Sequence, residues 1–289
     1  MSNLPPTKKV VLITGCSSGF GLLTAARLAS SGHIVYASMR DIKKKSALLS
    51  EVNKREGSLN VIELDVIDHH SIQKAVQKIG QNEGYLDVLI NNAGYGIGGA
   101  FEDLSEDDIR RQMDTNFFGV QNVTRAAIPL MRQRKGAKII NISSVSGFSP
   151  SPGFGAYSSS KWALEAFSES LKYELSLFGI DVLLVQPGSY KTKIFFENCR
   201  YAKNFDNEHS PYFALSQHLK NRVNAHVGAS QKDPEQVAAL IEKLIRQKYP
   251  KFRNIPDLNS QIHYYCRKFL PFRVYSWIVK RTVFNGFQP

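Results

Sequence analysis

The sequence predicts an α/β fold built on a doubly wound, open parallel sheet, with ligands at the carboxyl ends of its strands. Two observations lead to this prediction. Short apolar runs alternate with segments of helical spacing, and each run is apolar throughout, as in parallel strands that are covered on both faces. The expected strands are residues 10–14, 34–38, 59–64, 86–90, 138–142 and 181–185.

Helices are expected between these strands and after the last of them, where apolar residues recur at three- and four-residue intervals. Pro129 falls inside the longest of these segments, and we expect it to kink the helix or make it irregular. The expected helices are residues 22–31, 43–55, 71–79, 106–134, 157–178 and 234–247.

The 289 residues are expected to form one Rossmann-fold catalytic domain, residues 1–257, with a C-terminal extension. Residues 191–230 are polar and aromatic without a clear period, which is typical of an inserted substrate loop or lid. Residues 258–289 form the basic, aromatic extension, which we expect to be helical.

Positive charge is concentrated near the C-terminus. From residue 240 to residue 289 there are ten Lys and Arg against two acids, so this stretch carries +8 of the net charge of +12. Basic residues interleaved with aromatics can lie in a membrane interface, which would make this a peripheral membrane contact. Alternatively, the aromatics pack onto the body and roof the substrate cleft, or they do both. Nucleic-acid binding is poorly supported, because no recognised binding motif accompanies the charge.

The three cysteines, Cys16, Cys199 and Cys266, are far apart and show no metal-ligand spacing, so neither a disulfide framework nor a metal site is expected. No apolar stretch is long enough for a signal peptide or a membrane span. These features favour a cytoplasmic protein with reduced thiols, with membrane association left open by the C-terminal extension.

A glycine-rich turn, Gly15-Cys16-Ser17-Ser18-Gly19-Phe20-Gly21, follows the first strand and opens the first helix. Glycines there let the backbone approach a pyrophosphate, and the N-terminus of the helix stabilises its charge. The spacing Gly-x-x-x-Gly-x-Gly differs from Gly-x-Gly-x-x-Gly, but the strand before it and the helix after it indicate a dinucleotide site.

The end of the second strand predicts which dinucleotide binds. An acid there accepts a hydrogen bond from the ribose of NAD, whereas an arginine suits the 2′-phosphate of NADP. No acid stands at the strand end, and Arg40 is available, so NADP is favoured. Asp41 keeps NAD open, since it would face the ribose if the turn were one residue different.

Tyr157 and Lys161 lie four residues apart in a predicted helix and therefore share one face. An ammonium group beside a phenol favours the phenolate, so we expect the pKa of Tyr157 to be lowered. Such a phenol would serve as a proton donor and acceptor near neutral pH.

Further motifs accompany the glycine-rich turn, Tyr157 and Lys161, namely Asp65, Asn91-Asn92-Ala93-Gly94, Asn116, Ser144 and Pro187-Gly188 with Thr192. With these motifs in this order, the chain resembles the classical short-chain dehydrogenase/reductases. The resemblance covers residues 8–195 and, more loosely, 233–255. Its C-terminal part is most similar to the 17β-hydroxysteroid-dehydrogenase-like and retinol-dehydrogenase-like branch, which handles bulky apolar alcohols and ketones.

The resemblance implies a role for each of these positions. Tyr157 would be the general acid/base, Lys161 would lower its pKa and hold the nicotinamide ribose, and Ser144 would bind the substrate oxygen. Asn116 would support a water-mediated proton relay. Ser143 competes with Ser144, although the family spacing fits Ser144. The implied cofactor contacts are Gly15, Ser17, Ser18, Gly19, Phe20, Gly21, Arg40, Asp65, Asn91, Asn92, Ala93, Gly94, Tyr157, Lys161, Pro187, Gly188 and Thr192.

The expected function is NADP(H)-dependent interconversion of a carbonyl and an alcohol on a bulky apolar substrate such as a steroid, retinoid or acyl derivative. Alternatives are NAD-dependent alcohol oxidation, a cofactor-binding regulatory protein without turnover, and a sugar-nucleotide epimerase or dehydratase. The resemblance also implies a homodimer or homotetramer.

Overall fold

The core of the protein is a parallel sheet of seven strands, seen in a computed structural model that describes residues 8–191 and 199–287. The strand order is β3-β2-β1-β4-β6-β7-β9. The order changes direction between β1 and β4, which is the switch point where open α/β sheets bind ligands. The strands are β1 (Val10–Ile13), β2 (Ile34–Met39), β3 (Asn60–Glu63), β4 (Val88–Asn91), β6 (Lys138–Ile142), β7 (Asp181–Val185) and β9 (Arg253–Asn254).

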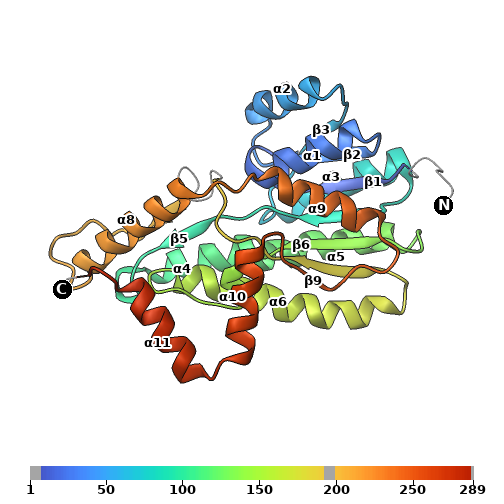
Figure 1. Cartoon of the computed structure of the whole chain (residues 1–289). Helices are drawn as coiled ribbons and strands as arrows, with labels where there is room; N and C mark the ends of the chain where they lie inside the picture. The colour runs from blue at the N-terminus through green and yellow to red at the C-terminus, as the bar shows by residue number, and fades with distance from the viewer. Residues whose placement is uncertain (1–7, 192–198, 288–289) are drawn as a thin grey trace.

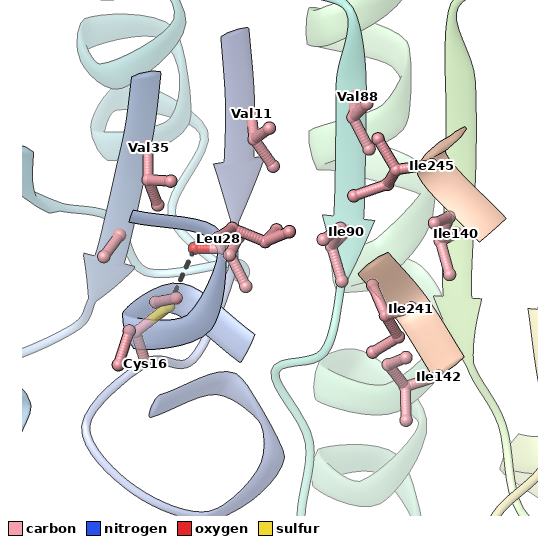
Figure 2. Close-up of a cluster of buried hydrophobic side chains, with 14 of the residues drawn as sticks. Val11, Cys16, Leu28, Val35, Val88, Ile90, Ile140, Ile142, Ile241 and Ile245 are labelled. Carbon is pink, nitrogen blue, oxygen red and sulfur yellow. Dashed lines mark hydrogen bonds between the residues drawn. The ribbon is translucent and has the colours of Figure 1, made fainter. Parts of the chain in front are cut away.

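Helices cover both faces of this sheet, which confirms the predicted doubly wound fold in one domain (Figure 1). Figure 2 shows the buried cluster on one face, where Leu28 of α1 and Ile241 of α9 pack with strand residues such as Ile140. That face is covered by α1 (Gly19–Ser30), α2 (Ser46–Lys54) and α9 (Glu235–Arg246), and the other by α3 (His69–Glu83), α5 (Gly119–Met131) and α6 (Gly155–Ser176).

The six predicted strands are all present, each with its ends within two residues of the prediction. Three further strands were not predicted. β9 has two residues, and β5 (Gly96–Gly98) and β8 (Cys199–Tyr201) have three each and form a separate parallel pair. Segments this short carry no periodicity that a sequence pattern could detect.

The long helix predicted at residues 106–134 is interrupted, and the interruption lies at a π turn rather than at Pro129. Helix α4 (Glu106–Met113) passes through a π-helical turn (Asp114–Phe118) into α5, while Pro129 lies within the last turn of α5. The helix also ends at Met131. Gly119, directly after the π turn, packs so closely on Val66 that a Cβ at residue 119 would lie 2.7 Å from a Val66 methyl carbon.

The insertion is more regular than predicted, because α8 (Phe213–Ala229) occupies its second half. Leu215, Leu219, Val223 and Val227 recur every four residues, a signal of this helix that the sequence does contain. The extension forms two helices, α10 (Leu258–Phe269) and α11 (Phe272–Val283), as expected. None of its described aromatics lines the cavity at the carboxyl edge of the sheet. Tyr275 is the one buried hydrophobic residue of the described part of the extension, and most of the others are exposed.

The structure also bears on metal sites, membrane-spanning helices and the thiol of Cys16. Within residues 8–191 and 199–287, no group of His, Cys, Asp and Glu could hold a metal ion. No helix in that part of the chain combines the length and apolarity needed to cross a bilayer. Cys16 is fully buried, and burial raises the pKa of its thiol, so it is a packing residue.

Asn91 belongs to a buried polar chain that ties β4 to its neighbours. Its Nδ2 donates to Thr124 Oγ1 at 3.0 Å and to Asn141 Oδ1 at 2.8 Å. Asn141 Nδ2 in turn donates to Ser168 Oγ at 2.8 Å. The chain therefore joins β4, β6, α5 and α6, and the Asn91 side chain is used for packing the fold.

We predict that Asn91→Ala lowers the free energy of unfolding by about 1–3 kcal/mol, because it leaves buried polar partners unpaired. Urea denaturation measures this change. Asn53→Ala, at an exposed position of α2, is the control and should change stability by less than about 0.5 kcal/mol. Unchanged stability together with weakened dinucleotide binding would instead place the Asn91 side chain at the ligand.

Candidate active site

The glycine-rich turn between β1 and α1 forms a bare backbone cradle at the switch point. Gly15 and Gly19 have φ angles of 73° and 59°, which glycine adopts without strain. A Cβ on Gly15 would lie 2.8 Å from Ala93 Cα, so no side chain fits there. The turn leads into the N-terminus of α1, whose first turn contains no acidic residue. This arrangement fits a pyrophosphate group.

The segment after β4 is fastened to this turn by four hydrogen bonds. Thr14 Oγ1 accepts from the backbone N–H groups of Asn92 and Ala93, both at 3.0 Å. Asn92 Nδ2 donates to the backbone oxygens of Thr14 and Gly15 at 2.9 and 3.0 Å. Asn92 thereby shapes the cradle from outside, and this explains why an amide stands at that position.

A cavity of about 460 Å³ opens beside this turn and brings most of the predicted site residues together. It runs along the carboxyl edge of the sheet, from the end of β2 to the segment after β7. The predicted residues that line it are Gly15, Ser17, Ser18, Gly19, Phe20, Arg40, Asp65, Asn92, Ala93, Gly94, Ser144, Tyr157, Lys161, Pro187 and Gly188.

Several lining residues were not predicted, among them Tyr95, Arg111, Thr115 and Arg200. Tyr95 follows the Asn91–Gly94 motif directly, and its position in the sequence could have identified it. Arg200 comes from the insertion, where no motif marks it, and its guanidinium lies 5.0 Å from the centre of the Tyr95 ring.

Three predicted cofactor or catalytic residues do not line the cavity. Gly21 lies in the first turn of α1 against Gly15 and Asn92, so its role is close packing. Asn91 and Asn116 are buried behind the wall and are 2% and 0% exposed. The side chains of Asn91 and Asn116 therefore do not line the cavity, and the cofactor contacts of Gly21 and Asn91 and the relay role of Asn116 stay predictions. Thr192 lies outside the described residues.

Asn116 lies in the π turn and connects two parts of the wall. Its Nδ2 donates to the backbone oxygen of Tyr95 at 3.0 Å and to Ser160 Oγ at 3.2 Å, and its Oδ1 accepts from Tyr95 N–H at 3.1 Å. Ser160 Oγ also donates to the backbone oxygen of Tyr157 at 2.7 Å. The Asn116 side chain thus holds the segment after β4 against the turn of α6 that carries Tyr157.

Tyr157 and Lys161 share one face of α6, but the predicted fall in the Tyr157 pKa is wrong. Burial raises the pKa of Tyr157 to about 12, against a smaller lowering by a hydrogen bond with Ser144. Burial also lowers the pKa of Lys161 to about 8. Lys161 Nζ donates to the backbone oxygen of Ile142 at 2.8 Å and lies 5.8 Å from the Tyr157 ring centre. Loss of solvent is therefore the largest cause of both pKa shifts.

Ser144, rather than Ser143, is positioned to act with Tyr157. The Ser144 side chain forms a hydrogen bond with Tyr157 and accepts from the backbone N–H of Ser146 at 3.1 Å. Ser143 is 4% exposed and lies beside Glu165. Burial raises the pKa of Glu165, and a hydrogen bond with Ser143 opposes this shift. The two neighbouring serines therefore point to different partners, as the alternation along a strand predicts.

At the other end of the cavity, the neighbours Arg40 and Asp41 also differ in position, and only Arg40 lines the cavity. Arg40 follows β2, is exposed, and lines the cavity. Asp41 caps the short 3₁₀ helix Ile42–Lys45, where its Oδ1 accepts from the backbone N–H of Lys43 at 3.0 Å. The carboxylate is thus engaged in local structure.

Comparison with known proteins gives a consistent result. The model of the short chain dehydrogenase family matches residues 9–200. The 3-ketodihydrosphingosine reductase of Bacteroides thetaiotaomicron is 39% identical over 85% of this chain and 86% of its own length. Retinol dehydrogenase 8 of Bos taurus is 36% identical over 88% of this chain and 82% of its own.

A solved structure extends the likeness to the whole chain. A short-chain dehydrogenase from Streptomyces avermitilis is 30% identical, covers 97% of both chains, and superposes with a TM-score of 0.78. The family predicted from the sequence is thereby confirmed, with retinol-dehydrogenase-like relatives as expected. This chain belongs to the short-chain dehydrogenase/reductase family of NAD(P)-dependent oxidoreductases.

Proposed function

We propose that this chain is an NADP(H)-dependent enzyme that interconverts a carbonyl group and an alcohol on a bulky apolar substrate. One observation carries the proposal: the pyrophosphate cradle and the hydroxyls of Ser144 and Tyr157 line a single cavity. The cofactor would supply or accept the hydride, while the protein orients the reactants and handles the proton. Asp65, Pro187 and Gly188, which line the same cavity, are proposed as further cofactor contacts.

In the reductive direction, Tyr157 would act as the general acid. A carbonyl that gains hydride develops negative charge on its oxygen, and two hydroxyl donors aimed at that oxygen stabilise it. Ser144 would provide one of these hydrogen bonds, and Tyr157 would provide the other and transfer its proton. The raised pKa keeps Tyr157 protonated at neutral pH, which suits a proton donor.

Lys161 and Asn116 would support Tyr157 in different ways. The Lys161 ammonium, 5.8 Å from the Tyr157 ring centre, would stabilise the phenolate that remains after proton transfer and would hold ribose hydroxyls. Asn116 is proposed as a positioning residue, because its side chain fixes α6 through Ser160. Its part in a water-mediated proton relay stays a prediction.

The preference for NADP rests on Arg40. A guanidinium binds a phosphate strongly through charge-assisted hydrogen bonds, and Arg40 lines the cavity beyond the pyrophosphate cradle, after β2. The competing carboxylate of Asp41 is occupied by the N–H of Lys43. This difference between neighbouring residues favours a 2′-phosphate over an unmodified ribose.

The substrate class is proposed from the relatives' names. One relative is named for a ketodihydrosphingosine and another for retinol, and both are largely apolar carbonyl or alcohol compounds. A steroid, retinoid or acyl derivative fits the same description. Assembly into a homodimer or homotetramer is proposed as well, since Phe118, Trp162 and Tyr173 are exposed on the helices that carry Asn116 and Tyr157.

Tyr157→Phe should abolish the NADPH oxidation that a suitable long-chain ketone supports, because the phenylalanine has no proton to donate. Absorbance of the reduced nicotinamide measures turnover, and quenching of protein fluorescence measures cofactor binding, which should be retained. Since general acid catalysis typically contributes about 10²–10⁴-fold, a loss smaller than tenfold would contradict the role of Tyr157.

Arg40→Ala should weaken NADPH binding by roughly 10–100-fold and leave NADH binding almost unchanged, because one charge-assisted contact contributes about 1.5–3 kcal/mol. The dissociation constants of both cofactors are the measurement. Asp41→Ala, which removes the neighbouring carboxylate, is the matched control. Equal weakening of both cofactors by Arg40→Ala would show that Arg40 does not read the 2′ position.

The pH dependence of ketone reduction should follow Lys161. Below pH 8 both Lys161 and Tyr157 are protonated, and kcat/KM should be constant. As the pH rises through about 8, Lys161 loses the charge that stabilises the phenolate, and kcat/KM should fall. Glu165→Gln should move this decline to lower pH, because the Glu165 carboxylate raises the pKa of Lys161. A profile that stays flat to pH 10 would contradict the assignment.

A further inference from the structure

The C-terminal hairpin of α10 and α11 turns an apolar stripe outward. On α10, the side chains of Leu258, Ile262, Tyr265 and Phe269 are 68%, 53%, 55% and 71% exposed. They are separated by four, three and four residues, so they form one continuous face of the helix. A surface helix of a globular protein normally directs such a stripe toward the core, and α10 does the reverse.

The apolar surface continues across the turn onto α11. Phe272 and Trp277 are 67% and 58% exposed, and Val274, Ile278 and Phe284 are exposed as well. Nine of the eighteen large hydrophobic residues exposed in the described chain lie between Leu258 and Phe284. Such a concentration marks an interaction surface rather than scattered surface residues.

The hairpin is fixed on its inner side, so its outer face is a built surface. His263 Nε2 of α10 lies 3.0 Å from Ser149 Oγ of the body and 2.9 Å from Tyr275 Oη of α11. Ser149 Oγ and Tyr275 Oη are also hydrogen-bonded to each other. Phe148 packs edge-on against the rings of His263 and Tyr264. Figure 1 shows the hairpin at the edge of the molecule, with its turn lowest in the view.

The charge of the hairpin indicates what binds it. Residues 258–289 contain no acid, whereas the basic residues are Arg267, Lys268, Arg273, Lys280 and Arg281. A second copy of the chain would place this cationic face against itself in a two-fold contact, which repels. An anionic bilayer offers both an apolar interior and a negative surface, and amphipathic basic helices bind such surfaces.

A hollow of about 410 Å³ lies beside α11 and has the composition of a head-group site. No carboxylate lines it, and Arg281 contacts the Trp277 ring with its guanidinium 5.3 Å from the ring centre. Guanidinium pairs bind phosphate, and tryptophan favours the membrane–water interface. The lining residues are Arg222, Trp277, Ile278, Arg281, Thr282 and Asn285.

We propose that the α10–α11 hairpin docks this protein on a bilayer rich in anionic phospholipid. The apolar side chains of both helices enter the interface, and the basic residues, with the hollow at Arg222 and Arg281, bind head-group phosphates. The proposal does not depend on the proposed function, since it concerns a surface and not the reaction.

The test is sedimentation of the full-length protein with vesicles of phosphatidylcholine alone or mixed with phosphatidylglycerol. Binding is expected to the mixed vesicles, and it should weaken as salt is raised, because salt screens the surface charge. Absence of binding to the mixed vesicles at low salt overturns the proposal. Equal binding to both kinds of vesicle overturns its electrostatic part.

Matched pairs of substitutions locate the surface. Phe269→Ser with Phe272→Ser should reduce the partition coefficient at least about tenfold, since two large apolar side chains no longer enter the interface. Phe101→Ser with Tyr249→Ser is the control pair, outside the hairpin and the helices proposed to pair subunits, with exposures of 79% and 84% against 71% and 67%. Circular dichroism confirms folding of each variant, and equal losses from both pairs overturn the assignment to the hairpin.

The contribution of the basic side chains and the insertion of the apolar side chains into the bilayer are measured separately. Arg273→Gln and Lys280→Gln should each lower binding about fivefold on mixed vesicles. In a Trp162→Phe background, Trp277 is the remaining tryptophan, and its emission should shift to the blue on binding. An unshifted emission overturns the proposed insertion.

The oligomeric state is a further test. If size-exclusion chromatography shows that the Phe269→Ser, Phe272→Ser pair dissociates an oligomer, a second copy covers the face and the proposal fails.

Discussion

The site depends on how closely the chain after β4 approaches the turn after β1. Gly15 lacks a Cβ because Ala93 Cα would lie 2.8 Å from it, and Gly21 packs against Asn92 and Gly15 for the same reason. The Thr14 hydroxyl and the Asn92 amide hold the two segments together. The residues that follow the other strands line the cavity beside this contact, since a parallel sheet brings the carboxyl ends of all its strands to one edge.

That regularity is why much of the fold and the site can be predicted from the sequence. Continuous apolar runs fix the strands, and the motif residues follow them directly, so Arg40, Asp65, Asn92 and Ser144 all reach the same cavity. Asn91 shows the limit of this reasoning. It is the last residue of β4, but its side chain points away from the cavity and bonds Thr124 and Asn141.

The burial of side chains and the local geometry of helices cannot be predicted from these sequence patterns. The spacing of Tyr157 and Lys161 predicts their proximity, yet the direction of the Tyr157 pKa shift depends on how much solvent is lost, and spacing does not contain this. The π turn is equally hard to predict from the sequence, because the residues of a π-helical turn are of the same kinds as those of an ordinary helical turn. It matters here, since it places Asn116 between Tyr95 and Ser160.

The C-terminal hairpin packs directly against the wall of the cavity. Gly188 lines the cavity and packs directly on Ser260 in the first turn of α10, where a Cβ at residue 188 would overlap the Ser260 hydroxyl. Lys232 and Asp257 form an ion pair at 2.6 Å beside the same contact. The helix whose outer face is proposed to meet the membrane therefore packs on a segment that forms the cavity wall.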